Sequence, residues 1–172
     1  MIRFFLLFLT IQAVLFGVEM LTVVQAAVVQ PWTSWVAKAS ALIVHVFDPS
    51  VISQGRVLQS AQTGFGVSIE PGCNGIEAAV VLIAAIVAFP SSWKMKLWGI
   101  GVGFVAVQAV NLIRVVSLFF LGQWNMQVFD FAHLYMWQAL IKLDVLVVWL
   151  LWMRYVAKHD GVRDTPAAPA AA

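Results

Sequence analysis

Charged residues and cysteine are both scarce in this 172-residue sequence. Asp, Glu, Lys and Arg make up 10% of the chain, whereas a typical soluble domain has about 25%. Hydrophobic residues make up 62%, and the mean hydropathy is +0.92. This composition excludes an ordinary soluble domain and favours a single membrane domain. The net charge of +2 is too small to indicate a nucleic acid partner, because the basic residues stand at segment ends and form no stripe.

The single cysteine, Cys73, excludes several kinds of site. One thiol forms no internal disulfide, no Cys-x-x-Cys redox pair and no multi-thiolate metal site. We therefore expect no metal and no cofactor. The sequence also has no internal repeat.

Four apolar stretches are long enough to cross a bilayer, whose hydrocarbon core needs about 20 helical residues. They predict an all-α polytopic membrane protein, a four-transmembrane-helix bundle with an outer interfacial helix and a short hairpin-like loop. A single integral membrane domain would occupy residues 1–160, followed by a disordered, low-complexity cytoplasmic tail at 161–172. The predicted spans are about 4–24, 73–89, 97–121 and 136–155.

The first apolar stretch has a competing interpretation as a signal peptide. Arg3 precedes it, and Val24-Gln25-Ala26 resembles a cleavage site. The apolar core of a signal peptide has only about 7–15 residues, however, and this stretch is longer. An uncleaved membrane anchor is therefore favoured.

Lysine and arginine predict the orientation, because cytoplasmic flanks of spans are enriched in both. The loop 122–133 has neither residue, and the loop 30–72 has only Lys38 and Arg56. Both termini and the turn after the second span are therefore expected on the cytoplasmic side of the membrane. The predicted cytoplasmic basic residues are Arg3, Lys94, Lys96, Arg154, Lys158 and Arg163.

The outer loop 30–72 has an organisation of its own. In 32–47, apolar residues recur at helical spacing, which predicts a helix lying in the membrane interface. A helix that covers a soluble core is less favoured, since no soluble domain is expected. Residues 56–59 and 65–69 predict two short strands with Gly64 at the turn. The predicted apolar face is Trp32, Trp35, Ala39, Leu42, Ile43 and Val46, opposite Ser34, Lys38 and Ser40.

Three chemically active residues are expected at one depth near the outer surface. Cys73 opens the second span, and His133 precedes the fourth. Arg114 comes about 25 Å along the third span at 1.5 Å per residue. A thiol, a guanidinium and an imidazole at one level suggest cysteine acyl transfer. The imidazole would take and return a proton, while the guanidinium would lower the pKa of the thiol and stabilise an oxyanion.

Each of these residues also has a structural interpretation. A lone cysteine in an apolar segment often only packs, although Pro71-Gly72 and Asn74-Gly75 place this one at a bend. Arg114 would otherwise extend to the interface. His133 would be an ordinary interfacial histidine, as we expect for His45 and His159. The shared depth favours the functional interpretation.

Other polar residues in the spans are weaker candidates. Glu77 lies one turn after Cys73 and is placed to pair with Arg114 or to orient His133. Glu19, Lys142 and Asp144 are expected to pair across the bundle. Three glycines predict close helix packing, and no dinucleotide fold is expected from them because no soluble strand precedes them. They are Gly99, Gly101 and Gly103.

The sequence resembles the exosortase/archaeosortase family, most closely the compact exosortase H type. The resemblance covers about residues 70–155. Family members have a Cys-(Ser/Asn)-Gly motif at the outer end of a span, an Asn-x-x-Arg motif in the next, and a His or Arg before a later one. The matching residues here are Cys73-Asn74-Gly75 with Glu70 upstream, Asn111-Leu112-Ile113-Arg114, and His133.

The resemblance implies a membrane-embedded cysteine protease or transpeptidase. Cys73 would be the nucleophile, His133 the acid and base, and Arg114 the stabiliser, supported by Glu70, Asn74, Glu77 and Asn111. Substrates would be membrane-anchored exported proteins with a C-terminal motif, a transmembrane helix and a basic tail. Two alternatives remain open: a non-catalytic scaffold that binds partner helices, and an aspartyl peptidase that uses Asp130 and Asp144.

Overall fold

The computed structural model describes residues 2–159, and most of them are helical. The predicted disorder of 161–172 falls outside this part of the chain. The helices are α1 (Ile2–Glu19), α2 (Thr22–Val24), the π-helix η1 (Gln25–Val29), α3 (Gln30–His45), α4 (Ile76–Ala88), α5 (Trp93–Trp124), α6 (Met126–Phe131), the π-helix η2 (Ala132–Met136) and α7 (Trp137–His159).

Three helical stretches within residues 2–159 are long and apolar enough to span a membrane. They are α1, α5 and the run Met126–His159, which joins α6, η2 and α7. The helix α4 corresponds to the predicted span 73–89 but has only 13 residues. At 1.5 Å per residue it is about 20 Å long, shorter than a hydrocarbon core of about 30 Å. It begins at Ile76 because the residues before it form a turn, so Cys73 lies outside the spanning helix.

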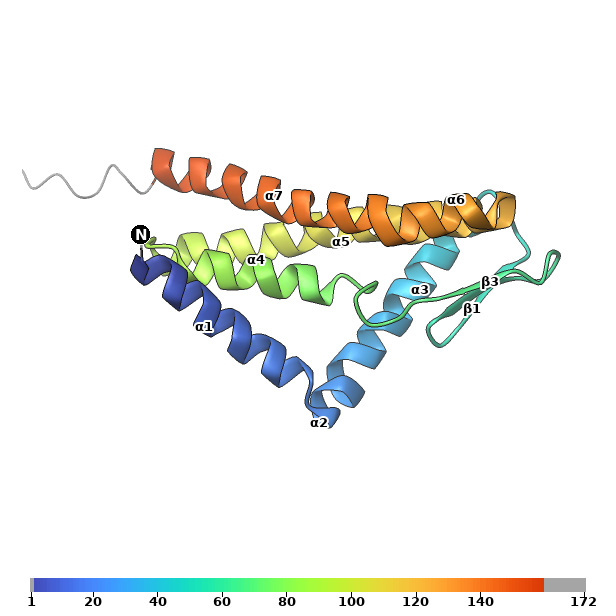
Figure 1. The fold of residues 1–172 in the computed structure, drawn as a ribbon, viewed down its shortest axis with the longest axis horizontal. Coiled ribbons are helices and arrows are strands. Elements are labelled where there is room, and N and C mark those ends of the chain that lie inside the picture. The colour runs from blue at the N-terminus through green and yellow to red at the C-terminus, as the bar shows by residue number, and fades with distance from the viewer. Residues whose placement is uncertain (1, 160–172) are drawn as a thin grey trace, which may run out of the picture.

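The two ends of the bundle differ in what they contain (Figure 1). The start of α1, the α4–α5 connection and the end of α7 lie at one end, while the strands and α6 lie at the other. Along its length α1 diverges from α4 toward α2, and α3 then runs back toward the strands. The strands and α6 therefore lie at the end of the bundle opposite to the N-terminus.

A small antiparallel sheet covers this end, with the order β1 (Val51–Gln54), β2 (Val57–Ser60) and β3 (Gly66–Ser68). The two predicted strands are confirmed with slightly different bounds. The strand β1 was missed, because its sequence Val-Ile-Ser-Gln does not alternate between apolar and polar residues. It joins β2 through the two-residue turn Gly55-Arg56, where Gly55 has a φ of 57°.

The helix α3, predicted to lie in the membrane interface, packs on this sheet and on α5. Of its predicted apolar face, Trp35 is 52% exposed and Leu42 is 73% exposed, while Ser40 of the predicted polar face is fully buried. Small side chains along the other stripe let α3 approach closely. The buried core residues here are Val36, Ala37, Ala41, Val44, Val51, Leu58, Ile69, Val115 and Phe119.

A second core joins α4, α5 and α7 at the other end of the bundle. A side chain at Gly99 would collide with the ring of Trp152, and one at Gly103 with Leu82. Both glycines therefore permit close helix packing, as predicted. The prediction was wrong for Gly101, which faces open space. The buried members of this core are Leu82, Ile86, Val107, Val145, Trp152 and Val156.

The predicted pairing of polar residues across the bundle was also wrong. Arg56–Glu70 is the one ion pair that the structure forms between side chains of residues 2–159. In the same range, Oε2 of Glu19 and Oδ2 of Asp144 are buried without a hydrogen-bond partner. The bundle is therefore held mainly by apolar packing.

Candidate active site

The loop that carries Cys73 is bent by two glycines. Gly72 has a φ of 85° and Gly75 a φ of 78°, values that only glycine adopts at low cost. At Gly75 a Cβ atom would also lie 2.7 Å from Nε2 of Gln108 and 3.1 Å from Cγ of Asn111. Gly75 is thus required both by the turn and by the close approach of α5.

Asn74 anchors this loop to α3 and to the start of α4. It is fully buried, its Nδ2 donates to Oγ1 of Thr33 at 3.1 Å, and its Oδ1 accepts from the N–H of Ile76 at 3.0 Å. Nε1 of Trp32 donates to its carbonyl oxygen at 3.2 Å. These bonds fix the position of the neighbouring Cys73.

Arg114 reaches the loop from α5. Its side chain is 1% exposed, so the guanidinium does not extend to the surface. Nη2 donates to Sγ of Cys73 at 3.3 Å, and Nη1 donates to the carbonyl oxygen of Gly72, also at 3.3 Å. One guanidinium therefore holds both the thiol and the backbone beside it.

Cys73, Arg114 and His133 line one pocket of about 190 Å³ at the end of the bundle that carries the sheet. The imidazole of His133 stacks on Phe129, with the ring centroids 5.6 Å apart and the planes 10° from parallel. No residue in the described range forms a hydrogen bond with its Nδ1, which is buried. The structure thus brings together the three residues that are distant in sequence, and it orients the imidazole by aromatic packing.

The pKa of the Cys73 thiol was expected to be low, and the structure gives the opposite direction. Burial raises this pKa, the guanidinium of Arg114 lowers it, and the carboxylates of Glu77 and Glu70 raise it. Burial outweighs the nearby positive charge, because a thiolate loses solvation in an apolar setting. The thiol is therefore protonated at neutral pH, and its use as a nucleophile requires a base.

Glu70 lines the same pocket and is held in place by polar contacts. Its carboxylate forms an ion pair with Arg56 at 3.0 Å and accepts from Oγ of Ser68 at 2.8 Å. The N–H of Ile69 donates to the carbonyl of Arg56 at 2.9 Å. Arg56 was not predicted as a site residue, because its position beside Glu70 depends on the β1–β2 turn.

Glu77 has a different partner from the two expected for it. Its Oε1 accepts a hydrogen bond from the N–H of Gly72, while its Oε2 is buried and has no partner among residues 2–159. It lines a neighbouring groove rather than the Cys73 pocket. Its observed role is to brace the loop from the α4 side.

Gln108 supports the loop from α5, and Asn111 lies beside Gly75. Nε2 of Gln108 donates to the carbonyl of Gly75 at 3.1 Å. Asn111 is fully buried, and neither atom of its amide has a hydrogen-bond partner within the described residues. Gln108 was not among the predicted site residues. Its signal was the three-residue spacing of Gln108, Asn111 and Arg114, which keeps them on neighbouring parts of one helix side.

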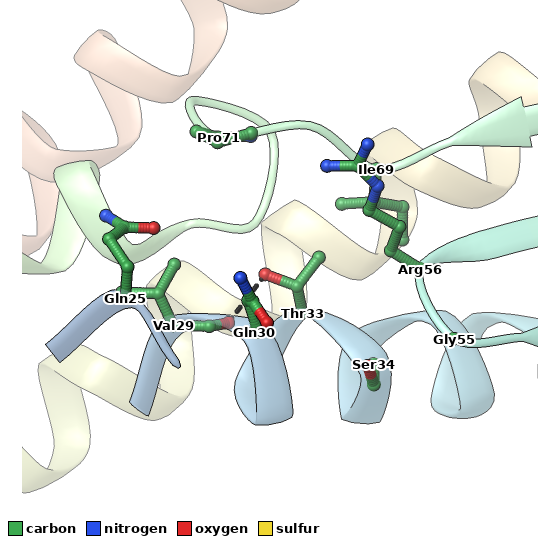
Figure 2. Close-up of a pocket in the computed structure, with 9 residues that line it drawn as sticks. All are labelled: Gln25, Val29, Gln30, Thr33, Ser34, Gly55, Arg56, Ile69 and Pro71. Atoms are coloured by element: carbon green, nitrogen blue, oxygen red, sulfur yellow. Dashed lines mark hydrogen bonds between the residues drawn. The ribbon is translucent and has the colours of Figure 1, made fainter. Parts of the chain in front are cut away.

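A larger pocket of about 490 Å³ lies beside the same loop, between α3 and residues 55–56 and 69–71. Figure 2 shows Gln25 and Pro71 on one side, Arg56 and Ile69 on the other, and the Thr33–Val29 hydrogen bond along α3. Its lining has amides, hydroxyls and a guanidinium but no thiol, imidazole or carboxylate. It is suited to bind polar groups and contains no residue of the predicted catalytic set.

No group of three or more His, Cys, Asp or Glu side chains within residues 2–159 is arranged to hold a metal ion. The polar groups near Cys73 are instead suited to proton transfer and charge stabilisation. The arrangement is that of a thiol with a buried cation in contact and an imidazole in the same pocket.

Comparison with known proteins gives one match. The family model described as transmembrane exosortase (Exosortase_EpsH) matches residues 1–150. Searches of curated proteins and of solved structures gave no match. With its three membrane-length apolar helices, the chain is a membrane protein, and it belongs to the transmembrane exosortase family.

Proposed function

We propose that this protein is a cysteine protease or transpeptidase that cleaves the C-terminal sorting signal of exported proteins at the periplasmic face. The observation that carries the proposal is the 3.3 Å contact between Nη2 of Arg114 and Sγ of Cys73, in a pocket that also contains His133. Family membership supports the general kind of activity. The compact exosortase H type remains our prediction for the subtype.

His133 is the proposed acid and base. Because the pKa of the Cys73 thiol is raised by burial, the imidazole takes the thiol proton as the sulfur attacks the scissile carbonyl carbon. The carbon–nitrogen bond then breaks, and the leaving amine receives that proton from the imidazolium. A thioester on Cys73 remains, and an acceptor nucleophile or water attacks it to release the product and restore the thiol.

Arg114 is the proposed stabiliser of negative charge. Its guanidinium contacts the sulfur and the adjacent Gly72 carbonyl, so it lies where the thiolate and then the oxyanion form. Burial strengthens this effect, since charge interactions are weakly screened away from water. The planar fork holds two groups in fixed directions, which a lysine does not.

The membrane setting completes the proposal. A single domain with four spans, α4 being the short one, would lie in the bacterial inner membrane with both termini cytoplasmic and the site periplasmic. The opposite locations of the N-terminus and the sheet support this orientation (Figure 1). Trp35 and Leu42 on α3 and Val46 directly after it are exposed and suit contact with the membrane interface. The proposed protein partners are exported substrates with a C-terminal motif, a transmembrane helix and a basic tail.

Processing of a co-expressed substrate tests the proposal. The substrate is an exported protein from the same genome with a C-terminal motif, helix and basic tail, and cleavage appears as a shift on a gel. Cys73→Ala and Cys73→Ser are both expected to abolish cleavage while the protein accumulates normally.

Normal cleavage by both variants would contradict the proposal. It would favour a non-catalytic scaffold in which Cys73 only packs against the core between α3, the sheet and α5. Loss of cleavage in Asp144→Asn with an active Cys73→Ala would instead favour an aspartyl peptidase. Neither Asp130 nor Asp144 lines the Cys73 pocket.

A further inference from the structure

A second groove, of about 280 Å³, meets the Cys73 pocket at Arg114. The loop 69–75, which carries Cys73, is called the nucleophile loop. Gly72 and Arg114 line the end of the groove nearest this loop. Farther along the groove, Ala78 and Val81 of α4 face Ile141 of α7. The groove therefore begins next to the reacting sulfur and continues along the membrane-spanning part of the bundle.

The two cavities differ in the elements that form them. The Cys73 pocket is lined by β3, by the loop after it and by α6, all at the end of the bundle that carries the sheet. The groove is lined mainly by α4 and α7, and its four polar side chains are Glu77, Arg114, Gln138 and Lys142. Arg114 is the only side chain from α5 that the two share. A chain passing from one cavity to the other would cross the guanidinium that contacts Sγ.

The position of α4 fits a transmembrane helix in this groove. The nucleophile loop immediately precedes the first turn of α4. A substrate helix that enters the membrane from the same side runs parallel to α4. Its first turn, when packed beside the first turn of α4, then lies level with Ile76, and the peptide bond before it lies level with Cys73. The helix α4 has 13 residues and is about 20 Å long, which is shorter than the hydrocarbon core of a bilayer. The nucleophile loop at its start is therefore expected to lie below the outer membrane surface.

We propose that the α4–α7 groove receives the first turns of the substrate's transmembrane helix, while the residues before the scissile bond occupy the Cys73 pocket. This inference rests on the proposed function and assigns the two sides of the cleaved bond to two cavities. Two features support this occupant: Arg114 lines both cavities, and Gly72, the residue before Cys73, lines the groove. The apolar walls of the groove suit a membrane helix.

Glu77 adds charge complementarity at the end of the groove nearest the nucleophile loop. Cleavage creates a new amino terminus at the start of the departing helix, and this amine becomes an ammonium at neutral pH. Oε2 of Glu77 is buried, and no atom within residues 2–159 forms a hydrogen bond with it. It is therefore available to bind that ammonium while Oε1 continues to hold the N–H of Gly72.

A third groove provides a matched control. It lies on the other side of α4, is mostly apolar and has a volume of about 540 Å³. Ile76 and Ile83 of α4 and Trp35 of α3 line it, but no residue of the nucleophile loop does. Ile76 and Ala78 are two residues apart on one helix, are both half-buried and line different grooves.

Disulfide cross-linking tests the assignment in the full-length membrane protein. The Cys73→Ala background has no other cysteine, so Ala78→Cys, Gln138→Cys and Ile76→Cys each supply a single thiol. The probe is the co-expressed substrate of the cleavage assay, with one cysteine engineered into the first turn of its helix. Oxidation in membranes is expected to cross-link it to the variants at 78 and 138, at least tenfold more than to the variant at 76.

Cross-linking at position 76 equal to or greater than at 78 would overturn the proposal, as would no cross-link at 78 and 138. Because the assay uses an inactive background, it is independent of catalysis. Cross-linking at 78 together with cleavage by Cys73→Ala would refute the proposed nucleophile and leave the groove assignment standing.

A second measurement separates docking from chemistry. Ala78→Trp fills the groove, and we expect cleavage to fall at least tenfold through KM. The rate at which a small reagent alkylates Cys73 is expected to stay within about twofold, because the thiol pocket is unchanged. Unchanged cleavage by Ala78→Trp would overturn the proposal.

Discussion

The nucleophile loop has two sides that differ in how their polar groups are satisfied. Toward α3, the side chain of Asn74 and its carbonyl are hydrogen-bonded to Thr33, Ile76 and Trp32. Toward α5 and η2, buried polar atoms have no partner among residues 2–159: Nε of Arg114, both amide atoms of Asn111, and Nδ1 of His133.

An unpaired buried polar group costs about 1–3 kcal/mol, so these atoms lower the stability of the protein, although Arg114 and Gln108 also hold the loop from this side. Such groups are expected where a molecule binds or a reaction occurs. We infer that the α3 side positions Cys73 and that the α5 side interacts with the substrate. The predictions below test this division, from the largest expected effect to the smallest.

His133→Gln is expected to lower the cleavage rate by about 10²–10⁴, the usual contribution of a positioned acid and base. The rate is measured with the co-expressed substrate at matched protein levels. His45→Gln is the control, because His45 is exposed at the end of α3 and lines no part of the pocket. Equal rates for the two variants would remove His133 from the mechanism.

Arg114→Lys is expected to lower the cleavage rate by about 10²–10³, as the loss of an oxyanion donor does. Lysine keeps the charge but lacks the fork that contacts both Gly72 and Cys73. Arg56→Lys is the control, since Arg56 is about half exposed. Near-normal cleavage by Arg114→Lys would return Arg114 to a structural role.

Asn74→Leu and Asn111→Leu compare the two sides directly, because leucine has the branched shape of asparagine and the same number of side-chain heavy atoms. Asn74→Leu breaks bonds to Thr33 and Ile76 and is expected to cost about 1–3 kcal/mol. Asn111→Leu removes an unpaired amide and is expected to leave the unfolding temperature unchanged or higher, with reduced cleavage. Thermal unfolding in detergent measures the stability of both variants, and the co-expressed substrate measures cleavage. Equal destabilisation by the two variants would contradict the division into two sides.

The alkylation rate of Cys73 is expected to rise about tenfold per pH unit, because only the thiolate reacts. Burial raises the pKa of this thiol, so the plateau should occur at a higher pH than for an exposed cysteine. Arg114 lowers that pKa, so Arg114→Met should move the plateau to still higher pH. A membrane-impermeant reagent on spheroplasts gives the same readout from outside. A plateau below neutral pH would show that the charge of Arg114 outweighs burial.

Arg56→Met is expected to have the smallest effect. The Arg56–Glu70 pair is about half exposed, and such pairs contribute about 0–1 kcal/mol. Stability should fall by no more than this amount, and cleavage by no more than a few fold. A larger loss of cleavage at unchanged stability would place Glu70 among the groups that contact the substrate.

The apolar runs and the motif residues were predictable because each signal is local in sequence. A span needs only a long apolar run, which is why α1, α5 and the helix ending at His159 were anticipated. The proximity of Cys73, Arg114 and His133, which line one pocket, was predicted from segment lengths and the expected direction of each span. Even the Gly64 turn was visible from residue type alone.

Contacts between segments were decided by the tertiary structure. The helix α3 has apolar residues on two opposite sides, so its sequence alone does not determine which side is buried. Packing against the sheet and α5 determines it. The raised pKa of Cys73 depends on burial that no neighbouring residue in sequence reveals. Similarly, Arg56 lies beside Glu70, and Gln108 beside Gly75, only because separate elements pack together. Composition and spacing determine which residues enter the membrane, whereas packing determines which polar groups are paired and which remain available for chemistry.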